Sequence, residues 1–226
     1  MQWINNYSLF LFDFDGVLAD TEQLHYRAYI EMCKRRGFAL NWNFERYSKA
    51  AHYSSTGLRD QIYAQFPDLQ EAEPKWQVLY EEKKQIFLDL IQSQEVPLIE
   101  GVATLLTALE NADITRCVVT HSPFSLIQII RKQNPILNTI PHWITRENYS
   151  KAKPDPECYE LAIKHYAKDN KVIGFEDSPR GLSALAQTKA RPVLICPPDS
   201  PYLEETLQRY PHVSHFQHFN SIHNLP

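Results

Sequence analysis

The chain has 226 residues, of which 43% are hydrophobic and 22% charged, a composition typical of a globular protein with room for one core and a smaller second domain. The formal net charge of −4, without a polybasic run, argues against nucleic-acid binding and against attraction to anionic membranes. Four scattered cysteines favour a reducing compartment, and no apolar stretch is long enough to cross a bilayer, so we expect a cytoplasmic protein.

The first predicted element is a short buried strand over residues 8–13, an apolar run that ends in Asp13 and opens into a glycine-containing loop. Helical spacing of apolar residues then follows over 22–37, 42–51, 57–66 and 74–92. No strand pattern appears between residues 22 and 97. The sequence therefore predicts an all-helical insertion over residues 21–97.

Strands and helices alternate in the second half of the chain. The predicted strands are 115–119, 142–145, 171–175 and 192–195, and the predicted helices are 101–111, 123–133, 155–167 and 179–188. Such alternation is typical of βαβ units and predicts an α/β fold with a parallel sheet. The tail after Pro197 is poorly patterned and predicts no element.

Polar clusters follow four of the predicted elements, and all four are expected to meet at the carboxyl edge of the sheet. They are Asp13 with Asp15 and Gly16, Thr120-His121-Ser122, Lys153-Pro-Asp-Pro, and Glu176-Asp177-Ser178. Four carboxylates in a small volume are unfavourable unless a cation neutralises them. Oxygen ligands without histidine or cysteine favour Mg²⁺, so the predicted metal ligands are Asp13, Asp15, Glu176 and Asp177.

These residue types suit phosphoryl transfer. Asp13 is the expected nucleophile, which would attack phosphorus and form an aspartyl phosphate. Asp15 would first protonate the leaving oxygen and then activate the water that hydrolyses the intermediate. Lys153 and Thr120 would bind the phosphoryl oxygens, and Gly16 would let the loop backbone approach the substrate.

Four motifs in this order resemble the haloacid dehalogenase superfamily, in particular its β-phosphoglucomutase and phosphoglycolate phosphatase branch. The motifs are Asp-x-Asp-Gly-Val-x-x-Asp-Thr-Glu from Asp13, a strand ending in Thr120, Lys-Pro-Asp-Pro from Lys153 and Glu-Asp-Ser from Glu176. The resemblance implies a Rossmann-like core over residues 1–20 and 98–226, a helical cap over 21–97, a Mg²⁺ cofactor and phosphatase activity on a small phosphorylated metabolite.

The expected substrate contacts are Gly16, His121 and Ser122 in the core and His25 and Arg59 in the cap. His121 follows Thr120 where relatives often carry Asn or Ala, which predicts an altered phosphate pocket. His25 stands where mutases and phosphatases of this branch both have His. Arg59, at the start of a cap helix, fits either a substrate contact or a solvated helix residue.

Two alternatives to a phosphatase remain open at the level of sequence. A sugar-phosphate mutase shares the first step but returns the phosphoryl group to a second hydroxyl of the sugar. A catalytically inactive binding protein of the same fold is the other, and the intact set of Asp13, Asp15, Lys153 and Asp177 argues against it. The expected state is a monomer with no nucleic-acid or membrane partner.

Overall fold

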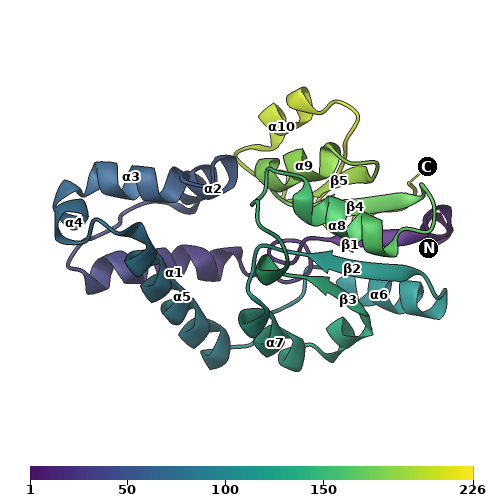
Figure 1. Cartoon of the computed structure of the whole chain (residues 1–226), viewed down its shortest axis with the longest axis horizontal. Helices are drawn as coiled ribbons and strands as arrows, with labels where there is room; N and C mark the ends of the chain where they lie inside the picture. The colour runs from purple at the N-terminus through teal and green to yellow at the C-terminus, as the bar shows by residue number, and fades with distance from the viewer. Residues whose placement is uncertain (226) are drawn as a thin grey trace. The chain divides into compact units, whose positions relative to one another are not determined.

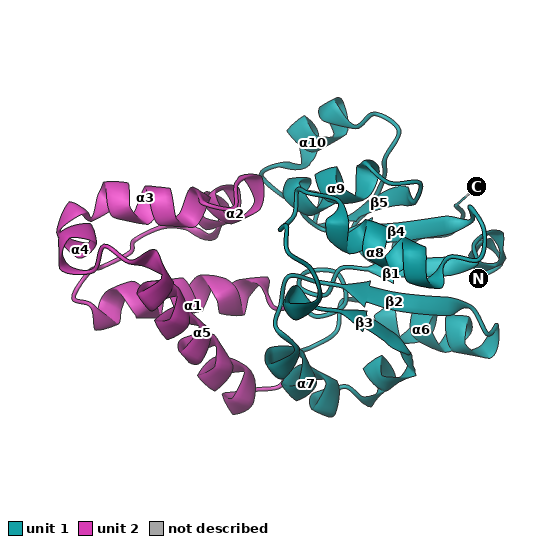
Figure 2. Cartoon of the chain, in the orientation of Figure 1, with its two compact units in different colours: residues 1–20, 96–226 teal, residues 21–95 magenta. Residues whose placement is uncertain are grey.

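The computed structural model describes residues 1–225, and the chain divides into two compact units (Figure 2). The sheet unit comprises Met1–Asp20 and the chain from Val96 onward, and the helical unit comprises Thr21–Glu95. The sequence predicted that the chain returns from the helical unit to the sheet unit between residues 97 and 98, two residues later than the structure has it. A cap role for the helical unit remains a proposal.

A six-stranded parallel sheet forms the centre of the sheet unit (Figure 1). Its strands are β1 (Leu9–Phe12), β2 (Thr115–Val119), β3 (His142–Ile144), β4 (Val172–Glu176), β5 (Arg191–Ile195) and β6 (Ser214–Phe216). Their spatial order is β3-β2-β1-β4-β5-β6, so β1 lies between β2 and β4. This arrangement confirms the predicted Rossmann-like α/β fold.

The helices of the sheet unit follow the strands in the order that the alternation predicted. They are α6 (Val102–Asn111), α7 (Phe124–Gln133), α8 (Glu157–Tyr166), α9 (Pro179–Ala186) and α10 (Leu203–Arg209), with short 3-10 turns η1 (Trp3–Asn6), η2 (Pro135–Thr139), η3 (Arg146–Asn148) and η4 (Phe219–Ser221). α9 begins after Ser178, whose hydroxyl accepts a hydrogen bond from the N–H of Gly181, and Pro179 occupies the first turn.

The two faces of β1 are packed differently. Leu9 and Leu11 belong to a hydrophobic cluster with residues of β2, α8 and α9, including Tyr159. Phe10 and Phe12 face the other way, and the ring of Phe12 stacks 5.3 Å from that of Phe175 on β4. All four β1 side chains are fully buried, as expected for a strand in the middle of a parallel sheet.

The helical unit contains α1 (Glu22–Arg35), α2 (Phe44–Tyr53), α3 (Gly57–Gln65), α4 (Pro67–Ala72) and α5 (Trp76–Ser93), and the structure describes no strand in it. α1 ends just before Gly37, which adopts a φ of 87° that non-glycine residues rarely adopt. Met32 and Ile86 are buried on α1 and α5, which pack against each other.

Three predicted features need correction. The gap between the predicted helices 57–66 and 74–92 contains a further helix, α4, which Pro67 begins because proline suits the first position of a helix. The tail after Pro197 was expected to lack elements, yet it contains α10 and β6. Several predicted ends are also one or two residues off, such as 155–167 for α8. None of the described helices is long and apolar enough to span a membrane.

Candidate active site

The predicted catalytic side chains follow three adjacent strands of the sheet. Asp13 comes directly after β1, and its N–H donates to the carbonyl of Phe175 on β4 at 2.9 Å, which fixes the start of the loop. Thr120 comes directly after β2, and its N–H donates to the carbonyl of Ile144 at 2.9 Å. Glu176 is the last residue of β4. Parallel pairing therefore brings segments that are far apart in sequence to one edge of the sheet.

Lys153 joins these segments. Its Nζ lies 2.9 Å from Oδ1 of Asp13, 2.7 Å from Oε1 of Glu176 and 3.0 Å from the carbonyl oxygen of Val119. The Lys153 side chain is only 6% exposed and that of Glu176 is fully buried. A charged amine in such a place is stable only because the carboxylates compensate it.

Burial and neighbouring charges shift the pKa values of Asp13 and Lys153. Burial raises the pKa of Asp13 to about 7; Lys153 opposes the shift, and the carboxylates of Glu176 and Asp15 add to it. Burial alone would lower the pKa of Lys153, but Asp13 and Glu176 outweigh it and hold that pKa well above its ordinary range. Lys153 is therefore a permanent cation. A further cation beside Asp13 would favour the ionised form of the Asp13 carboxyl group.

Asp13, Glu176 and Asp177 can each direct one carboxylate oxygen to a common point, because these three oxygens lie within 4.8 Å of one another. Oε2 of Glu176 is buried and has no hydrogen-bond partner among the described residues. An orphaned buried oxygen of this kind is costly unless a ligand satisfies it. Three carboxylates that meet in this way, beside a buried Glu176 oxygen that has no hydrogen-bond partner, fit a Mg²⁺ ion.

Two glycines make room for the carboxylates. A Cβ on Gly16 would lie 2.3 Å from Oδ2 of Asp177, and the φ of Gly16 is 73°. A Cβ on Gly181 in α9 would lie 2.0 Å from Oε2 of Glu176. Neither distance is compatible with a real side chain, so both carboxylates lie against bare backbone.

Asp15 has a different partner from the other acids. Its Oδ2 accepts a hydrogen bond from the hydroxyl of Ser122 at 2.5 Å, and the N–H of Ser122 donates to Oγ1 of Thr120 at 3.0 Å. The sequence grouped Asp15 with the metal ligands. Its carboxylate contacts the loop after β2, and the three carboxylates whose oxygens lie close together are those of Asp13, Glu176 and Asp177; a ligand role for Asp15 remains a proposal.

A family model described as haloacid dehalogenase-like hydrolase matches residues 10–195, which is most of the chain and includes every candidate catalytic segment described above. The chain belongs to the haloacid dehalogenase-like hydrolases. It is therefore an enzyme, and the resemblance inferred from the motifs is confirmed.

The curated relatives cover about four fifths of the chain at low identity. Protein CbbY of Cereibacter sphaeroides is 28% identical over 181 residues, 77% of each chain, and the phosphorylated carbohydrates phosphatase of Thermotoga maritima is 27% identical over 183 residues, 77% of this chain and 78% of the relative. Hexitol phosphatase A of Escherichia coli is 24% identical over 206 residues, 87% of each chain. Among solved structures, CbbY from Rhodobacter sphaeroides in complex with phosphate has a TM-score of 0.76 at 22% identity over 97% of both chains, which supports the fold.

The imidazole of His121, the residue after Thr120, has a hydrogen-bond partner that the sequence did not predict. The hydroxyl of Tyr149 lies 3.0 Å from the carbonyl oxygen of Thr120 and 2.9 Å from Nδ1 of His121. Burial lowers the pKa of His121 to about 3, and the positive charges of Arg180, Lys153 and Arg146 act in the same direction. The imidazole is therefore neutral near pH 7.

The two candidate contacts in the helical unit have partners of their own. Nδ1 of His25 lies 2.6 Å from Nζ of Lys83, and the His25 ring stacks 3.9 Å from that of Phe87. Lys83 is only 4% exposed, and sequence reasoning did not distinguish it from the other lysines of this unit. Arg59 is largely exposed and donates to Asp60 at 2.8 Å, in line with a solvated helix residue. Both residues remain proposals as substrate contacts.

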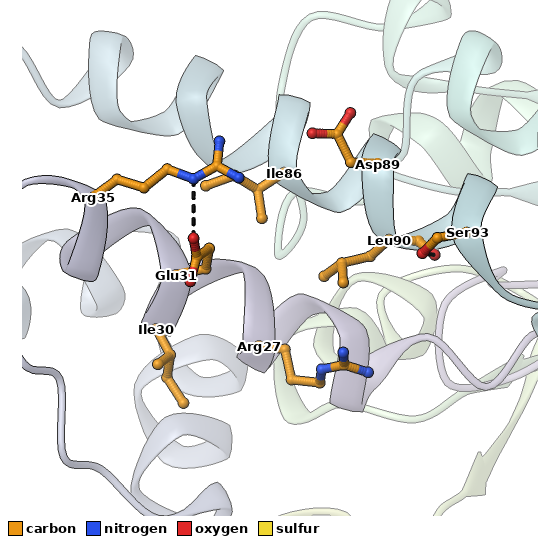
Figure 3. A pocket seen from close by; sticks show the side chains of 8 residues that line it. All are labelled: Arg27, Ile30, Glu31, Arg35, Ile86, Asp89, Leu90 and Ser93. Atoms are coloured by element: carbon orange, nitrogen blue, oxygen red, sulfur yellow. Dashed lines mark hydrogen bonds and ion pairs between the residues drawn. The ribbon is translucent and has the colours of Figure 1, made fainter.

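A separate pocket of about 490 Å³ lies within the helical unit, between α1 and α5 (Figure 3). Its lining includes both apolar and charged side chains, with Arg35 paired to Glu31 at 3.1 Å. Its lining residues are Arg27, Ile30, Glu31, Arg35, Ile86, Asp89, Leu90 and Ser93. None of the candidate catalytic residues of this haloacid dehalogenase-like hydrolase lines it.

Proposed function

We propose that the protein is a Mg²⁺-dependent phosphatase that hydrolyses a small phosphorylated metabolite, of the sugar phosphate class, through an aspartyl phosphate on Asp13. The enzyme is a phosphoric monoester hydrolase of the haloacid dehalogenase superfamily. The observation that carries the proposal is the 2.9 Å contact between Lys153 and Asp13, which pairs a carboxylate nucleophile with a buried cation. Sugar phosphates are favoured because several relatives are named for such substrates.

Asp13 attacks phosphorus with the oxygen that Lys153 does not hold. The ammonium of Lys153 keeps Oδ1 in place and stabilises the charge on the phosphoryl oxygens in the transition state. Thr120 is fully buried and its Oγ1 accepts the N–H of Ser122, so its own O–H is left to donate to a phosphoryl oxygen. Mg²⁺, held by Asp13, Asp177 and Glu176, would neutralise the carboxylates and the phosphate together.

Asp15 moves the protons. It donates one to the leaving oxygen of the ester as the phosphorus–oxygen bond breaks, and it later removes one from the water that attacks the aspartyl phosphate. Ser122 holds Asp15 through a 2.5 Å hydrogen bond and so limits where its carboxyl group can point.

The helical unit is proposed as a cap that excludes water and selects the substrate. All four cysteines are free and buried, which supports a cytoplasmic location.

The decisive experiment is a screen of phosphorylated metabolites with Mg²⁺ in which released phosphate is measured. We expect phosphate release from a subset of sugar and polyol phosphates, complete loss on chelation, and recovery on adding Mg²⁺. Asp13→Asn should show no turnover. Activity that Asp13→Asn leaves unchanged would rule out this mechanism.

The same screen distinguishes a hydrolase from a mutase. A phosphatase releases one inorganic phosphate for each ester consumed, whereas a mutase conserves organic phosphate and yields an isomer. A phosphorus NMR time course on each active substrate separates the two. Failure of every ester to react, with the fold intact, would favour a binding protein.

A further inference from the structure

The two oxygens of Glu176 have unequal surroundings. Oε1 accepts a hydrogen bond from the hydroxyl of Tyr159 at 2.5 Å and another from Nζ of Lys153 at 2.7 Å. Oε2 is buried without a hydrogen-bond partner in the part of the chain that the structure describes. One oxygen is therefore doubly satisfied while its neighbour has no protein partner.

Packing keeps this carboxylate in place. The Glu176 side chain is fully buried, and its carboxyl group lies where a Cβ on Gly181 would be, 2.0 Å from Oε2 and 2.3 Å from Oε1. The bare backbone of α9 therefore forms one wall of the space that holds the carboxylate. The two hydrogen bonds to Oε1 then leave Oε2 as the oxygen that has no partner among the described residues.

Lys153 is poorly suited to hold Oε1 of Glu176 alone. Its ammonium has three N–H groups and lies within 3.2 Å of four oxygens, those of Asp13, Val119, Glu176 and Tyr159. A phosphoryl group would compete for the same protons. The hydroxyl of Tyr159 has a single hydrogen, and the side chain is fully buried on α8, so its position is fixed.

We propose that Tyr159 is a positioning residue for the cation site, whose hydroxyl holds Oε1 of Glu176 and thereby presents Oε2 to the cation shared with Asp13 and Asp177. This inference rests on the Mg²⁺ site of the proposed function. Tyr159 does not touch the cation or the substrate; it acts through Glu176. It also keeps Glu176 oriented when Lys153 turns to a phosphoryl group.

The test is cation binding by Tyr159→Phe, which removes one oxygen and keeps the ring. Binding of Mn²⁺ to the full chain is followed by the loss of the free-ion EPR signal, and Mg²⁺ affinity is obtained by competition. We expect the dissociation constants of both ions to rise by about tenfold, the lower end of what loss of an outer-shell partner does. The apparent Mg²⁺ activation constant should rise in parallel, with kcat largely restored at saturating Mg²⁺.

The matched control is Tyr166→Phe, the same substitution on the same helix at a ring that stacks on His142, 3.9 Å away. It should bind both ions like the wild type. Equal cation affinity for Tyr159→Phe, Tyr166→Phe and the wild type would overturn the role of Tyr159 and leave the phosphatase proposal intact. A wild-type chain that binds neither ion would overturn the cation site and this inference together.

Glu176→Gln provides a second test that does not depend on how well Tyr159→Phe folds. With its carbonyl oxygen held by Tyr159 and Lys153, the amide would turn its NH₂ toward the cation, and affinity should fall by more than tenfold. Combining Tyr159→Phe with Glu176→Gln should then add little further loss, because both act on one ligand. Wild-type affinity in Glu176→Gln would overturn the proposal.

Discussion

Nζ of Lys153 lies 2.9 Å from Oδ1 of Asp13, although 140 residues separate the two in sequence. The contact joins the loop after β1 to the loop before α8. It also places a cation beside a carboxylate that burial would otherwise keep protonated. Stability and chemistry therefore depend on the same pair.

Lys153→Gln should damage both properties. The substitution leaves Asp13 and Glu176 buried without their cation, and breaking such a pair lowers the free energy of unfolding by about 3 kcal/mol. Urea denaturation measures the loss, and released phosphate measures the activity, which should fall below detection. Lys151→Gln is the control, because the Lys151 side chain is 72% exposed and its ion pair with Asp155 is long, at 3.6 Å. The denaturation midpoint of this variant should match that of the wild type. An unchanged midpoint for Lys153→Gln would show that the pair contributes nothing.

Asp15→Asn should affect substrates according to their leaving groups. An alkyl phosphate needs a proton on its leaving oxygen, so its turnover should fall by about 10²–10⁴-fold. Nitrophenolate leaves a nitrophenyl phosphate without being protonated. Formation of the aspartyl phosphate from this ester should therefore persist, while hydrolysis of the aspartyl phosphate slows. Stopped-flow absorbance should show a burst of one nitrophenolate per enzyme followed by slow turnover. A uniform loss with no burst would exclude the acid–base role of Asp15.

Gly16→Ala should weaken cation binding, whereas Gly37→Ala should not. Both glycines have positive φ, 73° and 87°, so both substitutions introduce backbone strain of about 1 kcal/mol. A Cβ at Gly16 also meets Oδ2 of Asp177 at 2.3 Å, while nothing lies within 4 Å of one at Gly37. Mn²⁺ titration of the two variants separates strain from the steric effect. Equal cation affinity in both would show that Asp177 is not held against Gly16.

His121 should destabilise the fold in acid. Its pKa is about 3 in the folded protein and near 6.5 when unfolded, so between these values the unfolded chain binds the extra proton. The free energy of unfolding should therefore fall as the pH drops through this window, by up to about 1.4 kcal/mol per pH unit from this group. Denaturation of His121→Asn at pH 4 to 6.5 should show a slope shallower by one proton. An identical slope would place the imidazole in contact with solvent.

The sequence was sufficient to predict the order of strands and helices in the sheet unit from β1 to β5, because each central strand is an apolar run followed by a polar loop. β6, a strand that pairs with β5 at one edge of the sheet, was missed since Ser214–Phe216 shows no apolar period. The candidate catalytic segments were found because each one places acidic, basic or hydroxyl side chains directly after an apolar element. Tyr159 was missed because its apolar spacing on α8 is that of any core aromatic, and its bond to Glu176 exists only after packing.

The unlike faces of β1 have a consequence for the nucleophile. Leucines point to one side of the strand and phenylalanines to the other, so a shift of a single residue against β2 and β4 would drive phenyl rings into the hydrophobic cluster that now surrounds Leu9 and Leu11. The same shift would withdraw Asp13 by about 3.3 Å and turn it to the opposite side of the sheet. Core mutations that make the register of β1 less well defined should therefore abolish activity at a smaller loss of stability than is needed to unfold the protein.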